Sequence, residues 1–539
     1  MSFGSFKQAP DMRPQFNVGF PFDIMTGRYH TGKHGESILS GGLNYLTGIA
    51  GRGNTFKTTI GEQLDNAVLN NYAGSVSQKY ETEISGSRQR KLELCKAFDQ
   101  IRGHDLFELG RTFLTDASEY SGTAWFEKVK EVLNERAKNR TGIKDTPFID
   151  SKGKYIPAFV PWNIFVDSLS MFRADVVAIL QNKGGVGDSE RNVEALRDAA
   201  SKSQFLGELP VLSARSGTYF ILTAHVGDRI QMDPYAPNPK KLEYLRNNAG
   251  FKHVPEKFSF LMNDCWMTIS SAPLVNQATK APEFPRDSAD DMKGDTDLVI
   301  IRMMNLRSKT GASGLPIEVV ASQSEGFKEG LSAFWYIRSF ERFGLGGNVQ
   351  NYFADLYPDC KLSRTTIRGK IDTDPRLTRA LIITAEMCQI KNLWHDVPDG
   401  LMCTPAELYA ALKAKGYDWD QLLDTRNYWV FTEDDASHPK RFLSTYDLLN
   451  MRLGTYRPYW MDKATTAAPA AVKTNARGQT TAVLHLDDSP FIEDVPAPVA
   501  EVTPVAVVAA KTTTPVTVSR PAPGKFKSVL NGVSANGGA

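Results

Sequence analysis

Long apolar runs are missing from this chain of 539 residues, and so is a strong excess of either charge. No stretch of about 18 apolar residues occurs, which excludes a membrane-spanning helix. The first residues, MSFGSFKQAPDMRPQF, contain no apolar signal core, so we expect an intracellular protein. The formal net charge is only +2. Any contact with nucleic acid must therefore come from local loops and not from a uniformly basic surface.

Cysteine is scarce and scattered. The five cysteines, Cys95, Cys265, Cys360, Cys388 and Cys403, show no CxxC spacing. Zinc sites and disulfide frameworks both use closely spaced cysteines, so we expect neither. The chain does contain 41% hydrophobic and 10% aromatic residues, which are ordinary values for a globular protein. Its length allows about two to four domains with a large core.

Strand-like and helical patterns alternate between residues 41 and 345. Strand-like runs occur at 43–50, 74–81, 162–169, 217–225, 264–271, 297–306 and 316–323, and helical patterns at 58–73 and 189–206. Alternation of this kind predicts an α/β fold with a largely parallel sheet.

The regions on either side of this core have a different composition. Residues 1–40 are rich in Gly, Pro and Phe, and we interpret them as an irregular N-terminal arm. Helical patterns dominate residues 346–462, with Thr404 and Ser444 as expected N-caps, and predict a small C-terminal helical domain. Residues 463–539 are rich in Ala, Thr, Pro and Val, which predicts a disordered tail.

The stretch LTGIAGRGNTFKTTIGEQL, residues 46–64, has the order expected of a phosphate-binding loop. Small residues let backbone N–H groups surround phosphates, a lysine contacts the β- and γ-phosphates, and a hydroxyl ligates Mg²⁺ at a helix N-terminus. A chance glycine-rich turn is the alternative interpretation, because Phe56 stands where glycine is usual. The candidate nucleotide-binding residues are Gly51, Gly53, Asn54, Thr55, Phe56, Lys57, Thr58 and Thr59.

Three later strand ends carry polar residues that suit an ATPase. Asp167 follows an apolar strand and can orient Mg²⁺ through water. Glu83, with Glu81 beside it, follows another strand and can polarise an attacking water. His225 ends a third strand, where a side chain near the γ-phosphate can sense ATP and move the following loop. The alternatives are, in the same order, a helix N-cap, a solvated acidic turn and an ordinary surface or core histidine.

Taken in chain order, as the loop, Glu83, Asp167-Ser168 and His225, the motifs resemble those of the RecA-fold ATPases, and most closely those of the bacteriophage strand-exchange recombinases of the UvsX type. Those recombinases carry a bulky Phe before the loop lysine, in the setting S-F-K-S, and this chain has TFKT at 55–58. Their Y-D-S-E, F-I-D-S-L and I-N-H strand ends correspond to residues 80–83, 165–169 and 223–225. Their later K-S-R motif corresponds to Arg307, Ser308 and Lys309. The resemblance covers residues 20–345.

The resemblance implies an ATP-Mg²⁺ site between the subunits of a homo-oligomeric helical filament, with DNA-binding loops that face the filament axis. Arg307 and Lys309 would then reach the ATP of a neighbouring subunit as cationic fingers. Residues 180–192 and 227–258 fit the DNA-binding loops. The second segment interleaves cations with aromatic residues, which suits single-stranded DNA, although a solvated surface insertion is the alternative. Its DNA-binding candidates are Arg229, Lys240, Lys241, Tyr244, Arg246, Lys252 and Lys257.

These motifs together predict an ATP-dependent DNA recombinase that coats single-stranded DNA and promotes homologous pairing and strand exchange. If it is encoded by a phage, it would act in the cytoplasm of a bacterial host. A hexameric replicative DNA helicase on the same core is an open alternative, because both proteins place ATP between subunits. A non-catalytic scaffold is a further alternative. The joint presence of Lys57, Thr58, Glu83 and Asp167 speaks against it, because a decayed site has no reason to keep all of them.

Overall fold

The computed structural model describes residues 10–461, apart from residues 85, 118–119, 141, 173–189, 229–248, 287–296 and 349. All of the described residues belong to one compact unit. No helix in this part of the chain is both long enough and apolar enough to cross a membrane.

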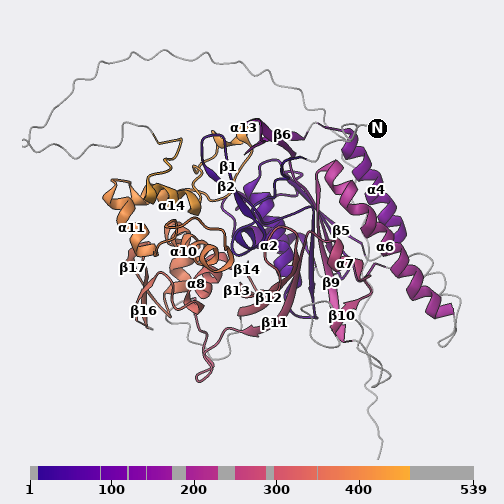
Figure 1. Ribbon diagram of the computed structural model, residues 1–539. Helices are drawn as coiled ribbons and strands as arrows, with labels where there is room; N and C mark the ends of the chain where they lie inside the picture. Colours follow the sequence, from indigo (N-terminus) through magenta and orange to yellow (C-terminus); the bar gives the residue numbers. More distant parts are fainter. Residues whose placement is uncertain are drawn as a thin grey trace, which may run out of the picture. The chain divides into compact units, whose positions relative to one another are not determined.

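A ten-stranded sheet forms the centre of the described unit, with the strand order β14-β13-β12-β11-β3-β9-β8-β4-β5 and with β10 paired to β9 (Figure 1). The neighbouring strands β11 (Asp264–Pro273), β3 (Leu46–Gly51), β9 (Thr218–Asp228), β8 (Trp162–Asp167), β4 (Val76–Glu81) and β5 (Thr112–Asp116) run parallel. The strands β12 (Leu298–Ser308), β13 (Pro316–Ser322), β14 (Gly326–Phe327) and β10 (Ala249–Lys252) pair antiparallel. The predicted α/β fold with a mostly parallel sheet is confirmed.

Helices cover both faces of the sheet. Successive side chains of a strand point to opposite faces, so a strand with apolar residues throughout packs against helices on each side. On β8, Phe165 packs in the same cluster as Ile60 and Leu64 of α2 (Lys57–Asn71). The flanking residues Ile164 and Val166 pack in a second cluster with side chains of α4 (Gly122–Lys138) and α6 (Glu190–Ser216). These two helices lie side by side in Figure 1. The carboxyl ends of β3, β4, β8 and β9 therefore share one edge of the sheet, between these helical layers.

Residues 10–40 are not the irregular arm that their composition suggested. They form α1 (Phe22–Thr26) and a hairpin of β1 (Arg28–Thr31) and β2 (Ser37–Ser40). Phe16 and Phe22 are fully buried in the main core cluster. Burial of one such side chain contributes about 1.5–3 kcal/mol, which holds the segment against the core. The available signal was the alternation of apolar residues at positions 16, 18, 20 and 22.

The remaining elements of the core connect or cover these strands. They are α3 (Arg88–Cys95), the hairpin of β6 (Ile143–Ile149) and β7 (Tyr155–Phe159), α7 (Lys257–Leu261) and α8 (Glu329–Ser339). The sequence pattern did not reveal β5, α4 or this hairpin.

The C-terminal region begins with a small three-stranded sheet, so it is not helical throughout. Its elements are β15 (Leu345–Gly347), β16 (Asn351–Ala354), β17 (Tyr357–Ser363), α9 (Ile367–Thr373), α10 (Pro375–Leu393), α11 (Pro405–Ala414), α12 (Trp419–Leu423), α13 (Thr432–Asp435) and α14 (Thr445–Leu453). Thr404 and Ser444 are N-caps within capping boxes, as predicted, and each such cap contributes about 1 kcal/mol. Leu381 of α10 shares the main core cluster with Phe334 of α8. The division into domains stays a prediction, and the expected disordered tail lies outside the described residues.

Candidate nucleotide site

The loop between β3 and α2 turns through two left-handed residues, Asn54 and Phe56, with φ of 58° and 62°. Such a conformation costs a residue with a side chain about 1–3 kcal/mol, which explains why glycine is usual before the lysine. The Phe56 ring packs against the main core cluster. Removing an aromatic ring from water contributes a comparable free energy and offsets the backbone cost. Phenylalanine is therefore tolerated at this position by its packing.

Hydroxyl groups anchor the loop to β11. Thr55 Oγ1 lies 2.7 Å from Thr268 Oγ1 and donates to the Arg52 carbonyl at 2.8 Å. Thr268 is the register neighbour of Gly51, and a Cβ on Gly51 would come within 2.0 Å of the Thr268 hydroxyl. Glycine is therefore required at position 51. Gly53, whose added Cβ would meet no atom within 4 Å, lies at the open side of the loop.

Lys57 opens helix α2, followed by Thr58 and Thr59 in the same turn. Lys57 is 8% exposed, and its Nζ donates to the Arg52 carbonyl at 2.8 Å. Burial lowers the pKa of Lys57, while the negative charges of Glu83 and Asp167 oppose that change. Hydrogen bonds between two charged groups are stronger than those to a neutral carbonyl. A phosphate would therefore replace the Arg52 carbonyl as the acceptor.

Asp167 and Thr58 meet at the carboxyl edge of the sheet. Thr58 Oγ1 donates to Asp167 Oδ2 at 2.7 Å, and Thr223 Oγ1 donates to Asp167 Oδ1 at 2.7 Å. Hydroxyl and carboxylate oxygens are hard ligands that suit Mg²⁺, which keeps several waters and takes few protein ligands. Among the described residues, no group of three or more His, Cys, Asp or Glu side chains could hold a metal alone. The Thr58 and Asp167 oxygens fit a magnesium ion whose other ligands are waters and phosphates.

Glu83 and His225 contact each other directly. His225 Nε2 lies 2.7 Å from Glu83 Oε1, and Ser168 Oγ donates to the same oxygen at 3.0 Å. The hydrogen bond from His225 lowers the pKa of Glu83, with partial burial acting in the opposite direction. Ser170 Oγ accepts from the His225 backbone N–H at 2.9 Å and so holds the strand end in place. The histidine expected to sense phosphate therefore touches the carboxylate expected to act on water.

Buried ion pairs support the strand that leads to Glu83. Lys79 lies 3.0 Å from Glu62 of α2 and 3.1 Å from Glu81, and all three side chains are nearly inaccessible to solvent. Glu81 Oε1 accepts from the Glu83 backbone N–H at 3.3 Å. The two neighbouring acids thus differ in environment. Glu81 is buried among ion pairs, whereas the Glu83 side chain is 37% exposed at the candidate site.

Arg307 and Lys309 lie away from the phosphate loop. Arg307 is the register neighbour of Cys265, which in turn pairs with Gly48 of β3. Because β12 is antiparallel to β11, the chain from Arg307 to Lys309 runs toward the amino end of β3. The Lys309 backbone N–H donates to the Asn263 carbonyl at 3.0 Å. The pair thus approaches the sheet edge opposite the phosphate loop.

Most of the DNA-binding candidates lie outside the described residues, namely Arg229, Lys240, Lys241, Tyr244, Arg246 and the first candidate loop up to residue 189. Lys252 lies on β10 and is the register neighbour of His225 on β9. Lys257 is the first residue of α7. Residues 229–248 thus join two strands that are paired beside His225.

Thr223 and Thr268 were not among the candidate site residues, for different reasons. Thr223 stands two positions before His225, on the same face of β9, and that period-two spacing could have revealed it. Thr268 gave no such signal. Its contact with Thr55 spans 213 residues and exists only because β11 pairs with β3.

Comparisons with known proteins add little to this geometry. No protein-family model matches the chain, and no curated protein matches it in sequence. Among solved structures, the crystal structure titled as that of the RadB recombinase is similar at 13% identity and a TM-score of 0.29, over 53% of this chain and 91% of the other. A likeness this weak carries no argument about function. The class of the protein, an α/β fold with a glycine-containing loop between β3 and α2 and acidic strand ends at one sheet edge, rests on the observations above.

Proposed function

We propose that this protein is a RecA-like, DNA-dependent ATPase that assembles on single-stranded DNA and promotes strand exchange, as UvsX-type recombinases do. The observation that carries the proposal is the 2.7 Å contact between Thr58 and Asp167. It joins the first turn of the phosphate-loop helix to the end of an apolar strand, where an ATPase needs its magnesium ligands. The contact between Glu83 and His225 at the same edge adds a base and its hydrogen-bond partner.

Each residue has a distinct role in the proposed hydrolysis. Lys57 exchanges the Arg52 carbonyl for the β- and γ-phosphates of ATP. Thr58 would ligate Mg²⁺, and Asp167 would hold it through water. When bound, the ion neutralises charge that develops on the phosphates. Glu83 orients the attacking water and accepts its proton.

His225 links the state of the nucleotide to DNA. Its ring contacts Glu83, and its backbone lies on β9 beside Lys252 of β10. A γ-phosphate close to Glu83 would alter the hydrogen bond between Glu83 and His225. The β9–β10 pair would then shift between two arrangements.

Arg307 and Lys309 serve the neighbouring subunit in this proposal. Their direction along β12 leads away from the phosphate loop of their own chain. Cations that approach the phosphates from a second subunit stabilise the transition state and make turnover depend on assembly. This arrangement suits a helical filament, and it equally suits the ring of a replicative helicase.

Electron microscopy of the full chain with single-stranded DNA and a slowly hydrolysed ATP analogue tests the proposed assembly. We expect filaments that coat the strand. Closed six-membered rings would instead indicate the helicase. An absence of DNA-dependent assembly would overturn both functions and favour the scaffold.

The Lys57→Ala variant tests the nucleotide site itself. We expect it to lose ATP binding and DNA-stimulated phosphate release, because it removes the ammonium that would contact the phosphates. Lys128→Ala is the control, since Lys128 lies on α4, outside the loop, and is 69% exposed. Normal turnover by Lys57→Ala would refute the assignment of the loop.

A further inference from the structure

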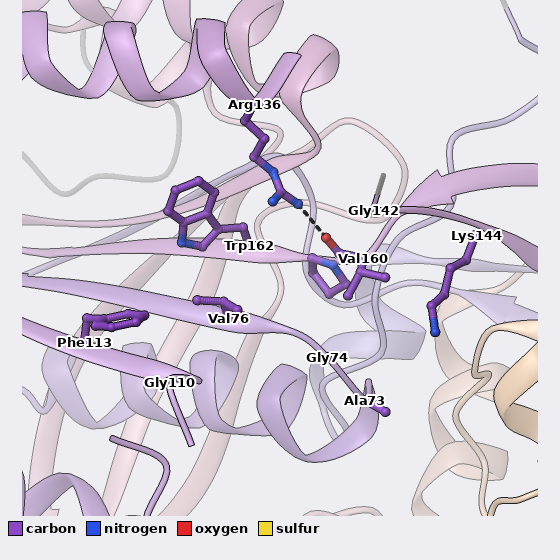
Figure 2. Close-up of a pocket in the computed structure, with 11 residues that line it drawn as sticks. Ala73, Gly74, Val76, Gly110, Phe113, Arg136, Gly142, Lys144, Val160 and Trp162 are labelled. Atoms are coloured by element: carbon purple, nitrogen blue, oxygen red, sulfur yellow. Dashed lines mark hydrogen bonds between the residues drawn. The ribbon is translucent and has the colours of Figure 1, made fainter. Parts of the chain in front are cut away.

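A pocket of about 500 Å³ opens at the sheet edge opposite the phosphate loop (Figure 2). Val76 and Trp162, which line it, are the first residues of β4 and β8, and Phe113 lies near the start of β5. The phosphate loop follows the carboxyl end of β3, which is parallel to these strands. The pocket is therefore separate from the nucleotide site and requires its own explanation.

The walls of the pocket are mainly apolar and aromatic. Trp162 and Phe113 supply aromatic surface, and Val76, Val160 and Pro161 supply aliphatic surface. Phe113 is 45% exposed even though it lies within a strand of the central sheet. An exposed aromatic residue in an apolar concave surface is typical of a ligand site.

Arg136 is held in place at this pocket before any ligand arrives. Its Nε donates to the Ser216 carbonyl at 2.8 Å, and its Nη2 donates to the Val160 carbonyl at 2.8 Å. The guanidinium lies 5.1 Å from the ring centroid of Trp162 and 5.7 Å from that of Phe159. Figure 2 shows the side chain reaching from α4 to Val160 beside Trp162. These contacts use two of the five N–H groups of arginine, so others remain for a ligand.

The charge of Arg136 is not balanced by a carboxylate in the described part of the chain. The other lining cation, Lys144, forms ion pairs with Glu433 and with Asp434, the latter at 3.3 Å. Among the described residues, no acidic side chain lies within ion-pair distance of Arg136, and none lines the pocket. The pocket therefore combines apolar walls with one pre-oriented and unbalanced positive charge.

We propose that this pocket binds a small aromatic carboxylate. Its ring would lie against Trp162 and Phe113, and its carboxylate would accept hydrogen bonds from Arg136. A guanidinium recognises a carboxylate through parallel charge-assisted N–H···O bonds, and because Arg136 is already fixed, little ordering cost opposes binding. The adjacent aromatic surfaces accept a flat ring.

A series of probes that differ only in charge tests this assignment on the full-length protein. Naphthalene-2-carboxylate, naphthalene-2-carboxamide and 2-naphthylmethylammonium share one ring system. Calorimetric titration should show saturable binding of the carboxylate at one molecule per chain. We expect the amide and the ammonium to bind at least tenfold more weakly. Equal binding of all three would show unspecific apolar contact and overturn the proposal.

Two variants and one matched control locate the bound carboxylate. Arg136→Gln should weaken carboxylate binding at least tenfold, and Phe113→Ser should weaken it severalfold while it leaves the Arg136 contacts intact. The control, Arg140→Gln, removes an exposed cation that lies just past the end of α4 and does not line the pocket. It should bind the carboxylate with the affinity of the parent. If Arg136→Gln fails to fold, the affinity of Phe113→Ser for the carboxylate provides the test. Unchanged affinity in Phe113→Ser, or in a folded Arg136→Gln, would place the probe elsewhere.

Discussion

The hydroxyl of Thr58 donates to the carboxylate of Asp167 at 2.7 Å, across 109 residues of sequence. Thr58 is in the first turn of α2, and Asp167 is the last residue of β8. In the sheet, β9 lies between β8 and the phosphate-loop strand β3, and Thr223 of β9 holds the second oxygen of the same carboxylate. One carboxylate thus connects the phosphate-loop helix with two strands at the edge where ATP is expected.

Asp167→Asn should remove the effect of magnesium on nucleotide binding. The amide keeps the size of the side chain but loses its charge, and outer-sphere partners of a metal typically contribute about 10–100-fold to its affinity. Titration with a fluorescent ATP analogue, with and without Mg²⁺, measures this. Asp399→Asn, at an exposed aspartate before α11, is the control. A variant whose ATP affinity still rises with Mg²⁺ would contradict the assigned role.

His225→Ala should move the acidic limb of the ATPase pH profile to higher pH. Glu83 must be ionised to accept a proton, and the hydrogen bond from His225 lowers the pKa of Glu83. Without it the carboxylate becomes protonated at a higher pH, so activity is lost sooner as the pH falls. Steady-state rates measured from about pH 3 to pH 7, a range that brackets the ordinary value of 4.5 for Glu83, give the profile.

Glu83→Gln is the companion variant to this pH experiment. It should lose turnover by about 10²–10⁴-fold at every pH and still bind ATP, since Lys57 and Thr58 are unchanged. An acidic limb that stays in place in His225→Ala would show that the contact does not control Glu83.

Mixing two inactive variants should restore activity if Arg307 and Lys309 act on a neighbour. Arg307→Ala/Lys309→Ala keeps its own Glu83, and Glu83→Gln keeps its own cations. In a mixed assembly, some sites combine an intact Glu83 with intact cations from the adjacent subunit. DNA-stimulated phosphate release measured across mixing ratios should peak near equal amounts. Activity that never exceeds that of the separate variants would exclude this contribution between subunits.

Lys91→Met should destabilise the protein by about 3–5 kcal/mol at pH 7, because it leaves buried carboxylates without their partner. Lys91 lies 2.7 Å from both Glu62 and Asp65, and its side chain is 5% exposed. Burial alone would raise the pKa of Glu62, but the charges of Lys91 and Lys79 outweigh it and lower that pKa to about 2. Urea denaturation monitored by circular dichroism measures the difference.

The sign of the pH dependence follows from the lowered pKa of Glu62. Its contribution is present above the unfolded-state value of about 4.5 and is lost as the pH falls toward about 2. The difference between Lys91→Met and the parent should therefore shrink over that range. Lys128→Met, which removes an exposed ion pair on α4, should cost no more than about 1 kcal/mol. A Lys91→Met effect as small as this control would show that the buried network is dispensable.

Local sequence patterns predicted the strands that form most of the sheet, because a buried strand is a short apolar run between turn residues. The N-caps at Thr404 and Ser444 could also be predicted from the sequence, since the residues of a capping box are close neighbours in the chain. The segment of residues 10–40 was misjudged. Its burial depends on contacts such as that of the Phe20 backbone N–H with Glu329, which composition does not disclose.

By itself the sequence determined the α/β class, the loop of small residues after β3 and the polar residues that end the strands, because each is encoded within a few consecutive positions. Only the tertiary structure decided that Glu83 contacts His225, that Thr268 anchors the loop, and that the chain from Arg307 to Lys309 runs away from it. These relationships depend on which strands become neighbours and in which register. Strand order is set by the packing of the whole sheet and its covering helices, and no local stretch of the chain carries it.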